Sequence, residues 1–155
     1  IIPLAPVISK LIDFFIAFIL LAGMMYYFGF TPSIDIIYLP LLILLMMFTA
    51  SGLGMWSTAL SIQYRDINYG MGFFVQLLMY AAPVVYPVSN VPESYRPIYG
   101  IFPMAGVIEG FRAILLQTIQ MPWDLILTGT FVSLVLFITG SFYFRRMEKF
   151  FADVA

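Results

Sequence analysis

The stretch that decides the fold is Ile36–Ile62, IIYLPLLILLMMFTASGLGMWSTALSI, which contains no charged residue. A helix rises about 1.5 Å per residue, so this run is longer than the ~30 Å hydrocarbon core of a bilayer and can cross it with some tilt. In the whole chain of 155 residues, 63% are hydrophobic and only 10% are charged. A soluble domain has about 25% charged residues, because it needs a polar surface. We therefore exclude a soluble enzyme and expect an integral membrane protein.

Three further apolar runs predict the rest of the topology. They are Leu11–Phe28, Ile67–Tyr86 and Leu125–Phe144. Together with the central run they predict an all-α polytopic helix bundle with four spanning helices, forming a single transmembrane domain over residues 1–155. The chain opens on apolar sequence at Ile1, without the charged start of a signal peptide, and we expect its N-terminal part to be missing.

The stretch Val91–Trp123 is different, because its apolar pieces are too short to span. Pro97–Ile108 and Ala113–Trp123 lie on either side of Glu109 and Arg112, and Pro103 also interrupts helical continuity. The stretch either enters the membrane and returns to the same side or crosses it, and the distribution of positive charges distinguishes the two. If the stretch dips in and returns, five cations lie on the cytoplasmic side: Lys10, Arg65, Arg145, Arg146 and Lys149. A crossing would place the last three outside, against the positive-inside rule, so we expect a re-entrant helix pair on the external side.

Two groups of residues are candidates for a gate or a transport pathway. The segment Pro83–Pro87, PVVYP, ends the third run, and Pro83, Tyr86 and Pro87 form either a flexible outer gate or a plain helix stop. Glu109 and Arg112 stand three residues apart on one helix face and can pair. Ionisable groups at membrane depth usually face a bundle interior or an aqueous cavity, so this pair is either a gate element or a self-neutralised structural pair.

A polar junction follows the central run. Tyr64, Arg65 and Asp66 separate the second and third runs and would lie on the cytoplasmic side. They form either a docking point for a cytoplasmic partner or a simple topogenic anchor. Small residues also predict close helix packing at a four-residue spacing, namely Ala50, Gly54 and Thr58, with Ser51 and Gly52 beside them.

The composition excludes several kinds of chemistry. The sequence has no His and no Cys, so imidazole bases, thiol nucleophiles and the usual zinc ligands are absent. It has no GxxxxGK[ST] loop for ATP. Lys and Arg number 7 against 8 Asp and Glu, which gives no basic surface for nucleic acid. We expect no catalytic residue, metal site or cofactor.

Four motifs, in this order, resemble one family. They are Gln63–Ile67 (QYRDI), Pro83–Pro87 (PVVYP), Ile108–Arg112 (IEGFR) and Arg146–Asp153 (RMEKFFAD). Together they resemble the membrane subunit of polysaccharide-exporting ABC transporters, the type-two permeases of O-antigen, capsule and teichoic-acid export. The resemblance covers essentially the whole chain, but only the later part of a family member, which normally has six spans. Where the family commonly has Asn-Pro-Met between the two re-entrant helices, this chain has Phe102-Pro103-Met104, and we add Pro103 to the gate candidates.

The resemblance implies a role and partners. The chain would be a multi-pass protein of the inner (cytoplasmic) membrane, surrounded by membrane lipids, and two copies would form a homodimeric channel over a cytoplasmic ATP-binding subunit. The substrate would be a lipid-linked polysaccharide. A type-two permease for drugs or lipids shares this architecture and is an alternative. From other classes, a membrane enzyme of polyprenyl-phosphate sugar metabolism and a non-catalytic membrane scaffold also remain as alternatives.

Overall fold

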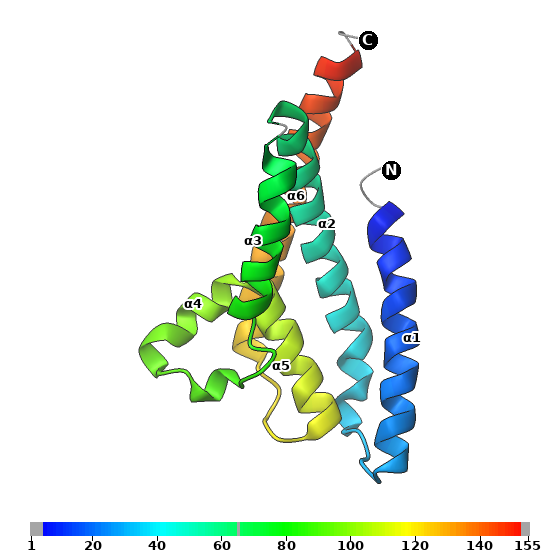
Figure 1. Cartoon of the computed structure of the whole chain (residues 1–155). Helices are drawn as coiled ribbons and strands as arrows, with labels where there is room; N and C mark the ends of the chain where they lie inside the picture. The colour runs from blue at the N-terminus through cyan, green and yellow to red at the C-terminus, as the bar shows by residue number, and fades with distance from the viewer. Residues whose placement is uncertain (1–4, 65, 153–155) are drawn as a thin grey trace.

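The computed structural model describes residues 5–64 and 66–152, and within these ranges every regular element is a helix (Figure 1). This confirms the all-α prediction. The α-helices are α1 (Ala5–Tyr27), α2 (Leu39–Gln63), α3 (Ile67–Ala81), α4 (Arg96–Ile101), α5 (Pro103–Leu116) and α6 (Trp123–Ala152). Short 3-10 helices are η2 (Ile34–Tyr38), η3 (Val88–Asn90) and η4 (Glu93–Tyr95).

Three segments of the described chain are long and apolar enough to cross a membrane: Ala5–Tyr27, Ile34–Ser61 and Trp123–Glu148. The prediction of four spanning helices is therefore not confirmed. The third predicted span, Ile67–Tyr86, is wrong as a continuous helix, because α3 has only 15 residues and ends at Ala81. The cause is Pro83, whose ring disfavours a helical conformation in the residue before it. Ala82 is accordingly extended, with φ −68° and ψ 140°.

The core of the molecule is the pair α2 and α6, which share the most extensive contact. A Cβ atom built on Gly52 would lie 2.9 Å from the backbone of Leu136, and one built on Gly140 would lie 2.9 Å from the carbonyl oxygen of Gly52. Small residues thus bring the two backbones together, as expected for helices in a membrane. The sequence predicted that Ala50, Gly54 and Thr58 make the close helix contact, and for Gly54 this is wrong. A Cβ atom on Gly54 would have no neighbouring atom within 4 Å, and Gly52 makes the contact instead.

Helix α5 packs into the groove formed by this pair. Its residues Val107 and Ile114 are buried with Leu42, Leu45 and Ile126 in one hydrophobic cluster. Figure 1 shows α4 and α5 as a helical hairpin toward the end of the bundle opposite the last turn of α6. The turn of the hairpin falls at Phe102–Pro103, where the sequence predicted the break between the two helices, because Pro103 takes the first position of α5. The two helices have the predicted order, and the second one, α5, carries both Glu109 and Arg112.

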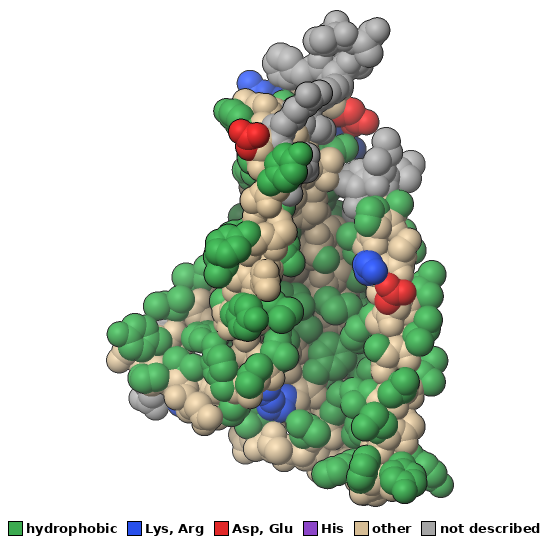
Figure 2. All heavy atoms as spheres, in the orientation of Figure 1, with side chains coloured by type: hydrophobic (Ala, Val, Ile, Leu, Met, Phe, Trp, Pro, Cys, Tyr) green, Lys and Arg blue, Asp and Glu red, His purple; other side chains and the backbone are tan. Residues whose placement is uncertain are grey.

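Helix α1 stands apart from this core, with Met25 its only buried residue (Figure 1). It contacts α5 through aromatic rings, the ring centroids of Phe14 and Phe18 lying 5.9 and 6.5 Å from that of Phe111. Figure 2 shows hydrophobic side chains covering the visible flank, and most of the visible charged side chains lie toward the end where α1 begins and α6 ends. A surface of this kind suits hydrocarbon along the flank and water at the ends.

Candidate functional site

The predicted ion pair on α5 is present and buried. Arg112 donates from Nη1 to Oε1 of Glu109 at 2.5 Å, across one helical turn. The Glu109 side chain is only 3% exposed and that of Arg112 is 16% exposed. A carboxylate so deep in an apolar bundle requires partners, because an isolated buried charge is strongly unfavourable.

The same two side chains also hold the segment that follows α3. Nη2 of Arg112 donates to the carbonyl oxygens of Pro83 and Val84, both at 3.1 Å. Oε1 of Glu109 accepts the backbone N–H of Val88 at 2.8 Å. The broken end of α3 frees backbone groups that need new partners in an apolar environment, and α5 supplies them. Two motifs that the sequence keeps 20 to 30 residues apart thus form one site, which we call the latch: Glu109 and Arg112 with residues 83–88.

Three of the remaining gate candidates, Pro83, Tyr86 and Pro87, belong to the latch. Pro83 is fully buried, and Pro87 directly precedes the anchored Val88. The Tyr86 hydroxyl group lies 2.7 Å from that of Tyr99 in α4, so the segment is also tied to the first helix of the hairpin. Pro103 lies elsewhere, at the start of α5, where its backbone meets α6 at Gly129.

A second polar connection fixes the C-terminal end of α5, and sequence reasoning missed it. Gln117 is the C-cap in the left-handed region, with φ 52°, and its Nε2 donates to the Thr31 carbonyl oxygen at 2.7 Å. The backbone N–H of Ser33 donates to the Ile114 carbonyl oxygen at 2.9 Å. A polar residue ending an apolar helix was the available signal, although its partner lies 86 residues away. Helix α5 is therefore anchored to two segments, residues 83–88 and residues 31–33.

The coupling candidates lie at the opposite end of α3. Tyr64 is the C-cap of α2 and is 55% exposed, and Asp66 is the exposed N-cap of α3. Arg65 lies outside the described residues. The 15 residues of α3 separate this junction from the latch by about 22 Å. The two groups of candidates thus occupy the two ends of one helix.

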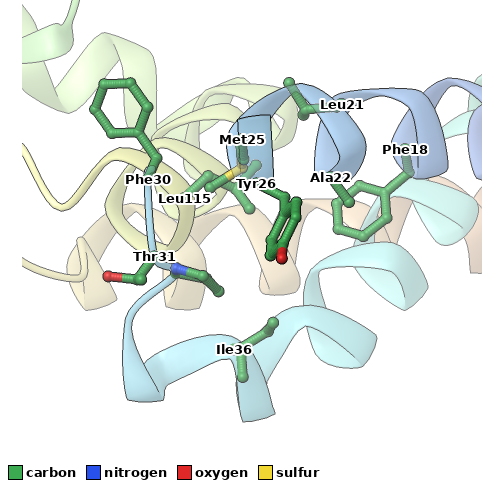
Figure 3. A pocket seen from close by; sticks show the side chains of 10 residues that line it. Phe18, Leu21, Ala22, Met25, Tyr26, Phe30, Thr31, Ile36 and Leu115 are labelled. Carbon is green, nitrogen blue, oxygen red and sulfur yellow. The ribbon is translucent and has the colours of Figure 1, made fainter. Parts of the chain in front are cut away.

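An apolar cavity of about 290 Å³ opens beside the site, between α1, η2 and α5 (Figure 3). Phe18, Leu21, Met25, Phe30, Ile36 and Leu115 are among the residues that line it. The residues that line the cavity include no acidic or basic side chain, so the cavity suits an apolar group rather than acid–base chemistry. Within residues 5–64 and 66–152, no group of three or more Asp or Glu residues is placed to hold a metal ion.

Comparisons with known proteins agree with this architecture. The family model described as "ABC-2 type transporter" matches residues 1–116. The O-antigen export system permease protein RfbA of Klebsiella pneumoniae is 22% identical over 155 residues, covering 99% of this chain and 60% of that protein. RfbA of Myxococcus xanthus is 24% identical over 157 residues, with the same coverage. The chain thus spans about 60% of the length of these relatives. Because the family model covers most of the chain, this protein belongs to the ABC-2 type transporter family, as a multi-pass protein of the cytoplasmic membrane.

Proposed function

We propose that this permease exports a lipid-linked polysaccharide across the cytoplasmic membrane, driven by ATP hydrolysis in a separate cytoplasmic ATP-binding subunit. The observation that carries the proposal is the similarity to O-antigen export permeases from two bacteria over nearly the whole chain. The sequence has no nucleotide-binding loop of the GxxxxGK[ST] type, which is consistent with ATP binding on a partner.

In this proposal α3 forms a fourth, broken crossing. Its helix accounts for about 22 Å of the ~30 Å of hydrocarbon, and the non-helical residues 82–87, which form a turn and bends, complete the crossing. The hairpin of α4 and α5 then enters from the external side and returns. The exposed cations Lys10, Arg145 and Arg146 support this orientation, because α1 begins and α6 ends toward one end of the bundle (Figure 1).

A second copy of the chain completes the channel in this proposal. Helix α3 presents large apolar side chains outward, including Tyr69, Phe73 and Tyr80, which are 67–87% exposed. Large exposed apolar surfaces mark contacts with another protein or with lipid. A homodimer with α3 near the shared surface covers part of this face, and membrane lipids cover the flank.

The candidate residues take two roles. Glu109, Arg112, Pro83, Tyr86 and Pro87 form or support an external gate, and Pro103 sets the turn of the hairpin beside it. Tyr64, Arg65 and Asp66 face the ATP-binding subunit. These roles are supported by the position of the two groups at opposite ends of α3.

The test is deletion of the reading frame in its host, followed by comparison of surface polysaccharide with polymer retained inside the cell. We expect lipid-linked polymer to accumulate on the cytoplasmic side and surface polymer to disappear, with recovery on complementation by the intact frame. Unchanged surface polymer would refute the proposal. If it were accompanied by altered drug susceptibility or lipid distribution, the result would favour the drug or lipid permease.

A further inference from the structure

The segment between α3 and α4 is buried at Pro83 and Val88, and between these two residues it is held mainly by hydrogen bonds to side chains. Val85 is 93% exposed and Val84 is 54% exposed, whereas Val88 at the anchored end is only 6% exposed. The anchoring bonds run from Arg112 to two carbonyl oxygens and from the Val88 N–H to Glu109. Two side chains of one helix thus bond to the backbone at both ends of the six-residue segment 83–88.

The hydrogen bonds that anchor residues 83–88 to α5 can break and form again. They join side chains to backbone groups, and the bond from Arg112 to Val84 lies on the exposed side of the site. When the segment leaves, water can replace the lost partners there, so the net cost of opening is far below the strength of the bonds themselves. The ion pair of Glu109 and Arg112 lies within α5 and does not involve the segment, so the buried carboxylate can keep its partner when the segment leaves.

Helix α3 can carry a displacement to this point. Its interior, Ile67–Ala81, contains no proline, and its packing on the rest of the chain is limited mainly to α2. It begins directly after the Tyr64–Asp66 junction and ends two residues before Pro83. A displacement of the Tyr64–Asp66 junction is therefore transmitted through α3 to the latch. While the latch is closed, the α4–α5 hairpin moves together with α3.

We propose that Glu109 and Arg112 form a reversible latch, in which the forked guanidinium group of Arg112 fixes the outer end of α3 to α5 and its release frees residues 83–88 during the transport cycle. Arg112 is in this view a positioning residue. Its planar fork is essential, because one nitrogen serves Glu109 while the other serves two carbonyl oxygens. The existence of the latch is independent of transport, whereas its opening by the partner rests on the proposed function.

The test uses the absence of cysteine from the chain. A single Val88→Cys change places a thiol on the latched segment at a site that is 6% exposed, and a Val107→Cys change gives a matched control on α5 that is 2% exposed. Val107 packs in the central cluster with Leu42 and Ile126, away from the latch. Each variant is labelled with a membrane-impermeant thiol reagent in right-side-out vesicles, and the labelling rate is measured.

We expect Arg112→Gln to raise the labelling rate of the Val88 variant about tenfold or more, because it removes charge-assisted bonds to the segment. The rate at the Val107 site stays unchanged. Arg112→Lys keeps a charge for Glu109 but cannot hold both carbonyl groups, so it raises the rate as well. A wild-type rate in Arg112→Lys would overturn the role of the fork. Equal increases at both sites would show general loosening, and no increase at either would show that packing holds the segment; both results overturn the latch.

The second arm adds the ATP-binding subunit and ATP to the otherwise unmodified Val88 variant. We expect ATP to raise the labelling rate, and a rate that does not respond would overturn reversible opening. The first arm needs neither ATP nor polysaccharide. The two proposals can therefore fail separately. If the first arm gives the expected labelling rates but the protein exports no polysaccharide, the proposed function is refuted and the latch is not.

Discussion

The contact between α5 and α6 at Gly106 gives a sharp quantitative prediction. A Cβ atom at this position would lie 2.6 Å from the Leu125 carbonyl oxygen and 2.8 Å from its carbonyl carbon. Ordinary van der Waals contact begins at 3.4 Å, so Gly106→Ala forces the two helices apart by about 0.8 Å. Both atoms belong to the backbone of α6, and neither can swing away as a side chain would.

We expect Gly106→Ala to lower the free energy of unfolding by about 1–3 kcal/mol, the usual cost of inserting a methyl group into a well-packed contact. Gly54→Ala is the matched control, because it lies in the interior of α2 with no atom within 4 Å of the added methyl group. Alanine favours a helix over glycine by up to about 1 kcal/mol, so the control is neutral or slightly stabilising.

The measurement is unfolding of the purified chain in detergent micelles, followed by the fluorescence of Trp56 and Trp123 during titration with a denaturing detergent. The difference between the two variants isolates the helix contact, since the chemical change is the same. A Gly106→Ala protein as stable as wild type, or an equal loss in Gly54→Ala, would refute the reasoning from backbone distance.

Three further predictions concern topology, the ion pair and coupling. Single cysteines at Ser94 and Asp124 should both react with an impermeant thiol reagent from outside intact cells, because the hairpin returns to its starting side; labelling of only one from outside would contradict the re-entrant topology. Replacement of Glu109 or Arg112 alone by Gln should lower export per inserted molecule more than replacement of both, because each single change leaves a buried charge unpaired. Additive losses in a double-mutant cycle would contradict the pairing. Asp66→Arg should reduce stimulation of the partner ATPase in reconstituted vesicles while membrane insertion, measured by fractionation, stays normal; unchanged stimulation would leave this junction as a topogenic anchor.

Much of the fold follows from local sequence signals. Hydropathy located α1, α2 and α6, because burial in lipid demands long apolar helices and little else. Pro103 indicated the turn of the hairpin, and the spacing of Glu109 and Arg112 indicated their pairing. Each of these features depends on residues that are close in the sequence, either within one continuous apolar run or within one helical turn.

The errors arose where the structure depends on distant partners or on one dihedral angle. Helix α3 ends at Ala81, five residues before the end of the apolar run at Tyr86, because Pro83 acts on the residue before it. The spacing of small residues gave Gly54, although Gly52 faces α6, since a row of small residues does not reveal which face meets a neighbour. The bonds from Arg112 to Pro83 and Val84 join residues 28 and 29 positions apart, and no local pattern encodes them.

The buried hydroxyl pair between α2 and α6 bears on how the ribosome can deliver this molecule to the bilayer. Thr49 donates to the Leu45 carbonyl oxygen within its own helix at 2.8 Å, so Ser133 donates to Thr49, also at 2.8 Å. During synthesis α2 can therefore lie in the lipid before α6 is made, because the hydroxyl hydrogen of Thr49 is already bonded within α2. Ser133 is made 84 residues later and finds its partner in place. Helices α2 and α5 leave the ribosome before α6, so the hydrophobic cluster that they share with Ile126 is complete only once α6 has been made.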